Sequence, residues 1–307
     1  MIEPHVDRRG FLAAAAAAAF LAGPARSVNF NLINILKTRA PRKIKKAVGI
    51  GMIGVKGTLA EKFQLLKDLG FDGVEVNRPD AAPIDELLKA RDAAKIEIAN
   101  VVDSVHWSQT LGDPDPEIRK KGRESLEAAL RDAKALDCKT VLLVPAVVND
   151  KISYADAYSR SQAEIKKVLP LAEELKVSIC IENVWNNFLL SPIEAARYVD
   201  ELGSEYAGFY FDVGNIILYG WPEHWIATLG KRIKNLHIKE YSRKKLDDEG
   251  RWKGFDADLL DGSNNWPVVM KALDAIGYTG WGVAEISGGD RKRLQVIAEK
   301  MDKIFAL

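Results

Sequence analysis

From Lys46 to the C-terminus the sequence alternates eight times between a short apolar run and a longer segment with helical periodicity. Such short runs predict buried parallel strands, and the segments between them predict the helices that connect parallel strands. The eight expected strands are Ala47–Ile53, Gly73–Val76, Ile96–Val102, Thr140–Val144, Val177–Ile181, Gly208–Val213, Ile233–Ile238 and Trp281–Ile286.

Helix-boundary signals lie between the expected strands. Thr58-Leu-Ala-Glu61 has the pattern of a capping box, and Ser191-Pro192 places a capping residue before a first-turn proline. Gly70, Gly203 and Gly277 fall where helices are expected to stop. Each helix therefore begins and ends where a strand–helix unit requires. The prediction is an α/β fold with a single domain, the (β/α)8 TIM barrel.

An internal repeat supports the closed barrel over an open sheet. Leu66–Val76 and Leu273–Ile286 both run from a helix through a glycine turn into a strand that ends near a glutamate. This is expected when one unit is repeated around a barrel. The main alternative is an open doubly wound sheet.

The first 27 residues have the pattern of a twin-arginine signal peptide. Arg8-Arg9 precedes an alanine-rich apolar stretch that ends near Gly23 and is followed by small residues. The stretch is shorter than the ~20 residues needed to span a bilayer, so a short membrane anchor is the weaker alternative. We therefore expect a signal peptide at 1–27, a linker at 28–45 and the barrel at 46–307, with export to the periplasm or another extracytoplasmic space and no stable membrane anchor after cleavage.

Charge and cysteine content limit the classes of partner. The chain has 44 basic and 43 acidic side chains and no long run of one sign, so nothing predicts binding to nucleic acid or to an anionic membrane. A small neutral ligand is favoured instead. Cys138 and Cys180 lie in or beside expected strands, which predicts two buried, unpaired cysteines.

Side chains that can bind a metal end four successive expected strands: Glu182, Asp212, His237 and Glu285. The chemistry of such barrels lies at the carboxyl ends of the strands, and neighbouring strands are only ~4.8 Å apart. The four side chains can therefore meet at one ion. Three carboxylates and one imidazole predict a single divalent cation, Mn²⁺, Mg²⁺ or Co²⁺.

The same residues carry a family resemblance that extends from about Lys46 to the C-terminus. The chain resembles the xylose isomerase-like barrel superfamily, and most of all its ketose 3-epimerase and sugar-phosphate isomerase/epimerase branches. The motifs are Ile181-Glu-Asn183, Phe211-Asp-Val-Gly-Asn215, Leu236-His-Ile-Lys-Glu-Tyr-Ser-Arg243 and Val283-Ala-Glu-Ile286. The resemblance implies that Glu182, Asp212, His237 and Glu285 bind the metal, that Glu182 and Glu285 move the proton, and that Arg243 contacts substrate.

One position departs from the resemblance, and several more are candidates for substrate contact. Asn215 stands where the ketose 3-epimerases have histidine, and an amide cannot donate a charge-assisted hydrogen bond. His106, Trp107, Glu75 and Trp185 follow or end other strands and are expected at the substrate. Trp252 and Trp266 lie in similar segments, where an aromatic residue more often simply packs.

The sequence thus predicts a metal-dependent sugar isomerase or epimerase of carbohydrate metabolism. Proton removal beside a carbonyl would give an enediolate, with two glutamates as acid and base. Export favours a non-phosphorylated ketose or related sugar. Two alternatives stay open, a lyase that opens 3-keto-glycosides by β-elimination and a non-catalytic sugar-binding barrel. With four histidines in all, a phosphodiesterase with a multi-metal site is disfavoured. The sequence leaves a homodimer open.

Overall fold

Eight parallel strands close into one barrel in chain order, and β8 pairs with β1. The computed structural model describes residues 42–80 and 82–307, so the expected signal peptide and most of the expected linker lie outside it. The strands are β1 Ile44–Gly49, β2 Gly73–Arg78, β3 Glu97–Asp103, β4 Thr140–Leu143, β5 Ser178–Glu182, β6 Ala207–Asp212, β7 Ile233–Ile238 and β8 Gly280–Ala284. The closed parallel barrel confirms the predicted fold class.

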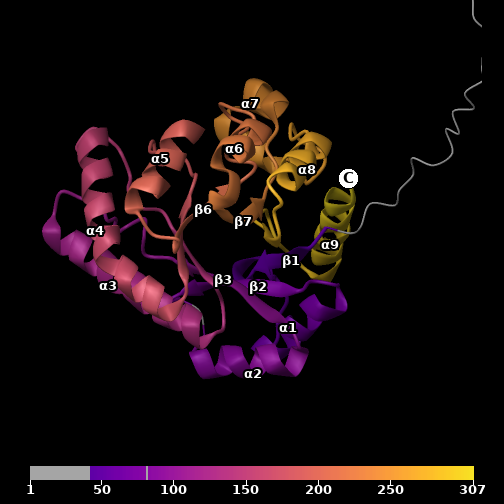
Figure 1. The fold of residues 1–307 in the computed structure, drawn as a ribbon. Helices are drawn as coiled ribbons and strands as arrows, with labels where there is room; N and C mark the ends of the chain where they lie inside the picture. The colour runs from indigo at the N-terminus through magenta and orange to yellow at the C-terminus, as the bar shows by residue number, and fades with distance from the viewer. Residues whose placement is uncertain (1–41, 81) are drawn as a thin grey trace, which may run out of the picture. The chain divides into compact units, whose positions relative to one another are not determined.

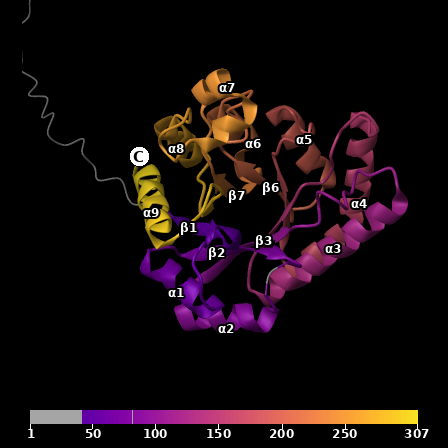
Figure 2. The ribbon, with the colours of Figure 1, turned by 180° about the vertical axis from the view of Figure 1, so that it is seen from behind.

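Helices surround the strands in both views of the molecule (Figure 1, Figure 2). One helix follows each of the first six strands and β8, and β7 is followed by a longer excursion that holds α7, a 3₁₀ segment (η3) and α8. The α-helices are α1 Leu59–Asp68, α2 Ile84–Ala94, α3 Pro116–Ala135, α4 Tyr154–Leu175, α5 Pro192–Leu202, α6 Pro222–Leu229, α7 Arg243–Glu249, α8 Trp266–Ala275 and α9 Arg291–Ala306. None of the helices in residues 42–80 and 82–307 combines the length and the apolarity needed to cross a membrane.

The predicted helix boundaries are present as hydrogen bonds and backbone angles. The Glu61 N–H donates to Thr58 Oγ1 at 3.3 Å and the Thr58 N–H to Glu61 Oε2 at 2.7 Å, which is a complete capping box. The Ser191 side chain caps α5. Gly70, Gly203 and Gly277 have φ angles of 81°, 71° and 68°, in the left-handed region where glycine ends helices at little cost.

The first strand lies earlier in the chain than predicted. Ile44–Gly49 replaces the expected Ala47–Ile53, because barrel closure pairs Ile44 with Gly280 and Val48 with Ala284. Ile44 and Lys45, assigned to the linker from the sequence, therefore belong to the barrel. Gly49–Gly54 has the GxGxxG spacing of a dinucleotide-binding loop, but residues 50–52 form a 3₁₀ turn and the next helix begins only at Leu59. The helix N-terminus that such a loop needs does not follow it.

The barrel strands bury polar as well as apolar side chains, among them Asn100, Thr140 and Asn235. Ala47, Ala99, Leu142, Cys180, Tyr210 and Val283 form a small apolar cluster, apart from the larger core between strands and helices. Cys138 and Cys180 are buried and free, as predicted.

The excursion between β7 and β8 is anchored by one buried carboxylate. Glu240 accepts hydrogen bonds from the Leu260 and Asn264 backbone N–H groups and from Trp266 Nε1, at 3.0, 3.1 and 2.8 Å. These bonds hold the end of the excursion against the strand end at Glu240. The 3₁₀ segment η3, Arg251–Asp256, is held by the Tyr241 hydroxyl, which donates to the Arg251 carbonyl oxygen at 2.7 Å, and by the Ser242 N–H, which donates to the Gly254 carbonyl oxygen at 2.9 Å.

Asp103, the last residue of β3, supplies a prediction on stability. Its Oδ1 accepts a hydrogen bond from Ser125, but its Oδ2 is buried with no hydrogen-bond partner, and burial raises the pKa of the carboxyl to about 6. Because the folded protein holds this proton more tightly than the unfolded chain does, stability is lost as pH rises from about 4 through 6. Asp103→Asn should therefore raise the free energy of unfolding by roughly 2 kcal/mol at pH 7.5. The gain should vanish near pH 4.

Denaturant unfolding at the two pH values measures this effect, with Asp150→Asn on an exposed loop as the control. Equal stability of Asp103→Asn and the parent at pH 7.5 would show that the buried carboxylate does not lower the free energy of unfolding.

Candidate active site

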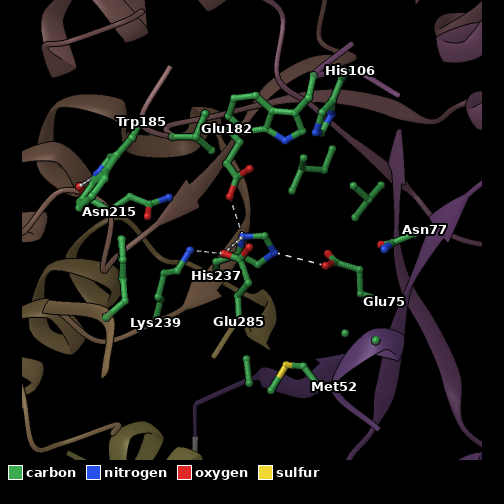
Figure 3. A pocket seen from close by; sticks show the side chains of 18 of the residues that line it. Met52, Glu75, Asn77, His106, Glu182, Trp185, Asn215, His237, Lys239 and Glu285 are labelled. Carbon is green, nitrogen blue, oxygen red and sulfur yellow. Dashed lines mark hydrogen bonds and ion pairs between the residues drawn. The ribbon is translucent and has the colours of Figure 1, made fainter. Parts of the chain in front are cut away.

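A pocket of about 630 Å³ lies at the carboxyl ends of the strands. Glu182, His237 and Glu285 line it, and Asp212 is fully buried beside them. Figure 3 shows the Glu182 and Glu285 side chains meeting at the same nitrogen of the His237 ring, Nδ1. The pocket occupies the end of the barrel where the sequence predicted the chemistry.

The four predicted metal ligands come together in space. Each offers one ligand atom, and these atoms all lie within 4.8 Å of one another. His237 Nδ1 is 2.7 Å from Glu182 Oε1, 3.1 Å from Glu285 Oε2 and 3.9 Å from Asp212 Oδ2. Ligand atoms on opposite sides of an ion bound at ~2.1 Å lie about twice that distance apart, so the cluster has the size of a one-ion site.

The strand ends explain why the ligands meet. Glu182 and Asp212 are the last residues of β5 and β6, His237 pairs with Asp212 in the ladder between β6 and β7, and Glu285 follows β8 directly. The Glu285 N–H donates to the Ile238 carbonyl oxygen at 3.2 Å, which continues the ladder one residue beyond β8. Backbone pairing alone thus sets the spacing of the cluster.

Asp212 is held with one oxygen available for a cation. The Asn215 N–H donates to Asp212 Oδ1 at 2.7 Å, whereas Oδ2 is buried and accepts no hydrogen bond. The Asn183 side chain binds the Asp212 peptide on both sides, donating to its carbonyl oxygen at 2.8 Å and accepting from its N–H at 2.9 Å. A buried carboxylate oxygen without a hydrogen bond is costly unless positive charge lies beside it, and the positive charge nearest to Oδ2 is Lys239 Nζ, at 3.3 Å. Three carboxylates and one imidazole, with ligand atoms within 4.8 Å of one another, fit a divalent metal.

The buried carboxylates of the metal-ligand cluster are stabilised by positive charge beside them. Burial raises the pKa of Asp212 to about 8 and raises the pKa of Glu182, because desolvation disfavours their anionic forms. Burial acts in the same direction on Glu285, but Lys239 and His237 outweigh it and hold the Glu285 pKa well below its usual value. Burial favours a neutral His237, yet the carboxylates of Glu285, Glu75 and Glu182 raise its pKa well above the usual range.

Lys239 is a pocket residue to which the sequence analysis assigned no role. Its Nζ lies 2.8 Å from Glu285 Oε2 and 3.3 Å from Asp212 Oδ2, and the side chain is 18% exposed. Side chains two residues apart on a strand share a face, so Lys239 points to the same side as His237. That alternation was the signal that could have identified it. Lys239 brings a cation to the metal-ligand cluster.

His106 and Trp107 reach the pocket from the loop after β3, as predicted. His106 is buried, and its Nδ1 accepts a hydrogen bond from the Val144 N–H at 3.2 Å. Burial lowers the His106 pKa to about 4, so the ring is neutral and carries its proton on Nε2. Trp107 is 51% exposed and packs edge-on against His106. The pair offers one hydrogen-bond donor and one aromatic face.

Trp185 and Asn215 also line the pocket. Trp185 Nε1 donates to the Asn215 carbonyl oxygen at 3.0 Å, and the Asn215 amide donates to the Asn183 carbonyl oxygen at 2.9 Å. Trp252 and Phe255 of η3 pack against Trp185 with ring centroids 4.9 and 4.6 Å away. The three rings make an aromatic wall, which we define as Trp185, Trp252 and Phe255. Trp266 is instead buried against Glu240.

Two further predicted substrate contacts have partners within the protein. Glu75 borders the pocket, but its carboxylate faces His237, Asn100 and Tyr210. Arg243 is not among the lining residues of the pocket: its guanidinium donates to the Ile217 and Gly220 carbonyl oxygens at 3.0 and 2.7 Å. Arg243 is the first residue of α7, and the bonds tie that helix to the loop after β6.

Comparisons with known proteins agree with this architecture. Residues 63–306 match a family model described as xylose isomerase-like TIM barrel. A candidate L-ribulose-5-phosphate 3-epimerase of Escherichia coli is 24% identical over 236 residues, which cover 72% of this chain and 80% of that protein.

Two solved structures share the fold. A D-tagatose 3-epimerase-like protein superposes with a TM-score of 0.72 at 21% identity, covering 85% of this chain and 97% of that one. The 3-keto-D-glucoside 4-epimerase of E. coli superposes with a TM-score of 0.72 at 15% identity, covering 86% and 100%.

Proposed function

The chain belongs to the xylose isomerase-like TIM barrel family, and on that premise we propose that it is a divalent-metal-dependent sugar isomerase or epimerase. The observation that carries the proposal is the cluster of Glu182, Asp212, His237 and Glu285, whose ligand atoms lie within 4.8 Å of one another at a pocket. Relatives named as epimerases and isomerases support the same reaction class. A sugar-binding barrel without catalysis would have no use for two glutamates at the same centre.

The reaction requires a proton to leave a carbon next to a carbonyl group. A divalent cation held by the four ligands would act as a Lewis acid for the negative charge that develops on the sugar oxygens. Glu182 Oε1 and Glu285 Oε2 both lie beside His237 Nδ1, at 2.7 and 3.1 Å, so one centre has two carboxylates, one to remove the proton and one to return it. Return to the opposite face of the carbon inverts the centre, and return to the neighbouring carbon isomerises the sugar.

Lys239 supplies a fixed positive charge to the same reaction. Its Nζ lies beside Glu285 and Asp212 and lines the pocket. An ammonium group in a site with little water stabilises an oxyanion more strongly than it would in solution. We assign Lys239 the role of donor to a substrate oxygen that gains negative charge.

This role gives a prediction that separates Lys239 from the metal ligands. Lys239→Met should lower kcat by about 10²-fold, the usual effect of removing one oxyanion donor. Affinity for Mn²⁺ should stay equal or rise, because a neighbouring cation has gone. Steady-state kinetics and Mn²⁺ titration test this, with Lys244→Met on the surface of α7 as the control. Loss of Mn²⁺ affinity, or an unchanged kcat, would refute the assignment.

A neutral sugar is the proposed substrate. Lys239 is the one lysine or arginine among the described residues that line the pocket, and Glu285 and Asp212 already engage it. A phosphate group is usually bound by several donors, such as arginines or a helix N-terminus, and one lysine shared with two carboxylates does not supply them. Aromatic faces such as that of Trp185 suit the apolar face of a sugar ring.

A 3-keto-glycoside is the second candidate substrate, favoured by the size of the pocket. About 630 Å³ lies within the range of clefts that hold drug-sized ligands of roughly 300–1,000 Å³, and so accommodates more than one sugar ring. Trp252 and Trp107 are 69% and 51% exposed and could stack against a second ring. The same proton removal would then lead either to epimerisation or to β-elimination of the aglycone.

We also propose that the protein works outside the cytoplasm, on the sequence alone. Arg8-Arg9 and the apolar stretch after them form the twin-arginine pattern and lie outside the described residues. Fractionation that finds the mature chain only in the cytoplasm would contradict this.

A substrate panel tests the proposed function. Full-length protein loaded with Mn²⁺ is incubated with D-fructose, D-tagatose, L-ribulose 5-phosphate and a 3-keto-glucoside, and the products are identified by NMR. Turnover of a neutral sugar with kcat/KM at least ten-fold above that for the phosphate is expected. Preference for the phosphate would overturn the substrate class, and a lyase would be recognised by release of the aglycone. A metal-loaded protein that converts none of them would contradict the proposal.

A further inference from the structure

Glu75 lies on β2, and its carboxylate contacts the side chains of three other strands. It is 5% exposed. Its Oε1 lies 3.3 Å from His237 Nε2, and its Oε2 accepts hydrogen bonds from the Tyr210 hydroxyl at 2.6 Å and from Asn100 Nδ2 at 2.9 Å. Figure 3 shows Glu75 and Glu182 on opposite sides of the His237 ring. The carboxylate therefore contacts the ring nitrogen that the metal-ligand cluster does not use.

The position of Glu75 is fixed by a buried chain of hydrogen bonds. Asn235 Nδ2 donates to Thr140 Oγ1 at 2.8 Å, and the Thr140 hydroxyl donates to Asn100 Oδ1 at 2.8 Å. Asn100 then donates to Glu75. Asn235, Thr140, Asn100 and Tyr210 are all buried. Side chains from β7, β4, β3 and β6 thus hold one oxygen of Glu75 in place and leave the other for His237.

The groups around His237 determine which of its two ring nitrogens carries the proton. Its Nδ1 faces Glu182, Glu285 and Asp212 and must present a lone pair if the cluster holds a cation. A neutral ring with a free Nδ1 carries its proton on Nε2, and that proton needs an acceptor. Since Oε2 already takes two donors, Oε1 of Glu75 is the acceptor nearest to Nε2.

We propose that Glu75 is a positioning residue, which holds His237 with its proton on Nε2 and its Nδ1 lone pair turned to the metal. This inference rests on the proposed metal-dependent function, and it replaces the substrate contact expected for Glu75 from the sequence. The hydrogen bonds that link Asn235, Thr140 and Asn100, together with the bond from Tyr210, keep the Glu75 carboxylate from turning toward substrate. Metal affinity is thus set partly by a residue that touches neither the metal nor the sugar.

Glu75→Gln is the sharpest test because it keeps the shape and removes one acceptor. If the amide oxygen stays near His237, the amide nitrogen meets two donors, Tyr210 and Asn100. If the amide turns, its nitrogen meets Nε2 and favours the tautomer with the proton on Nδ1. The first orientation keeps the acceptor for Nε2–H but sets the amide nitrogen against two donors, and the second removes the acceptor. Since neither holds the ring as the carboxylate does, the Kd for Mn²⁺ should rise about 10- to 100-fold.

Two further variants keep the test decisive. Tyr210→Phe removes one donor to Glu75 without touching the ligands and should raise the Mn²⁺ Kd several-fold. Asn77→Ala, on the same strand and at the pocket wall, is the matched control and should leave the Kd unchanged. Thermal unfolding of each metal-free variant checks that the barrel is intact.

The readouts are Mn²⁺ calorimetry and long-range ¹H–¹⁵N NMR of the histidines in Zn²⁺-loaded protein. The parent should show the Nε2–H tautomer for His237, and Glu75→Gln should lose it. Unchanged Mn²⁺ affinity and tautomer in Glu75→Gln, with a raised KM, would make Glu75 a substrate contact and overturn the inference alone. A parent protein that binds no divalent cation would overturn the proposed function with it.

Discussion

Replacing either Glu182 or Glu285 with glutamine is expected to lower kcat by about 10³-fold or more, in both directions of the reaction. Acid–base groups contribute roughly 10²- to 10⁴-fold each, and both glutamates also sit among the metal ligands. Glutamine keeps an oxygen for the cation but cannot accept and return a proton. The loss should persist at saturating Mn²⁺, which separates proton transfer from metal binding.

The measurement is steady-state kinetics with metal content determined on the same samples. Glu97→Gln is the control, since Glu97 lies at the start of β3 and pairs with the exposed Lys45. Nearly full activity in either variant, with the metal bound, would remove that glutamate from the proton-transfer pair. If only one variant keeps activity, a one-base mechanism would replace the two-base mechanism proposed above.

Metal removal gives the second large effect. Chelation should abolish turnover, and Mn²⁺ at 100 times its Kd should stabilise the fold by about 2.7 kcal/mol. For a domain of this size that corresponds to a rise in Tm of roughly 5–10 °C. Asp212→Asn should lose both the activity and the rise in Tm, because Asp212 Oδ2 is the buried oxygen left without a hydrogen bond.

The same variant should stabilise the metal-free protein. Burial raises the pKa of Asp212, so the metal-free fold loses stability as pH rises through that pKa, and asparagine removes the cost. Differential scanning fluorimetry with and without Mn²⁺, from pH 5 to pH 9, follows both effects. An Asp212→Asn protein with the parent's response to Mn²⁺ would show that this residue is not a ligand.

The barrel and the ligand cluster could be predicted because each depends on local pattern. Eight apolar runs alternate with helical segments, helix signals such as Thr58–Glu61 mark some of the boundaries, and a side chain at a strand end reaches the barrel mouth in any TIM barrel. Glu182, Asp212, His237 and Glu285 followed from that rule. The start of β1 did not, because Ile44 becomes a strand residue only through its pairing with Gly280 across the closed barrel.

The surroundings of Arg243 and Glu75 depend on neighbours far apart in the chain. The family resemblance implies that Arg243 contacts substrate, and in the structure its guanidinium donates to the carbonyl oxygens of Ile217 and Gly220. Glu75 meets Tyr210 and His237 across the barrel, at separations of 135 and 162 residues. Side-chain direction within such a network is set by packing. The place of Lys239 in the pocket could have been predicted from the sequence, because it lies two residues after His237 and so faces the same side.

The central claim is that this chain removes and returns a proton on a sugar carbon beside a carbonyl. Deuterium exchange tests it most directly: full-length, Mn²⁺-loaded protein is incubated in D₂O with neutral ketoses and 3-keto-glycosides, and NMR follows deuterium at each carbon. Deuterium is expected next to the carbonyl, and its incorporation should be absent after chelation and strongly reduced in Glu182→Gln and Glu285→Gln. A protein that binds Mn²⁺ with all four ligands intact and still exchanges no carbon-bound hydrogen would contradict the claim.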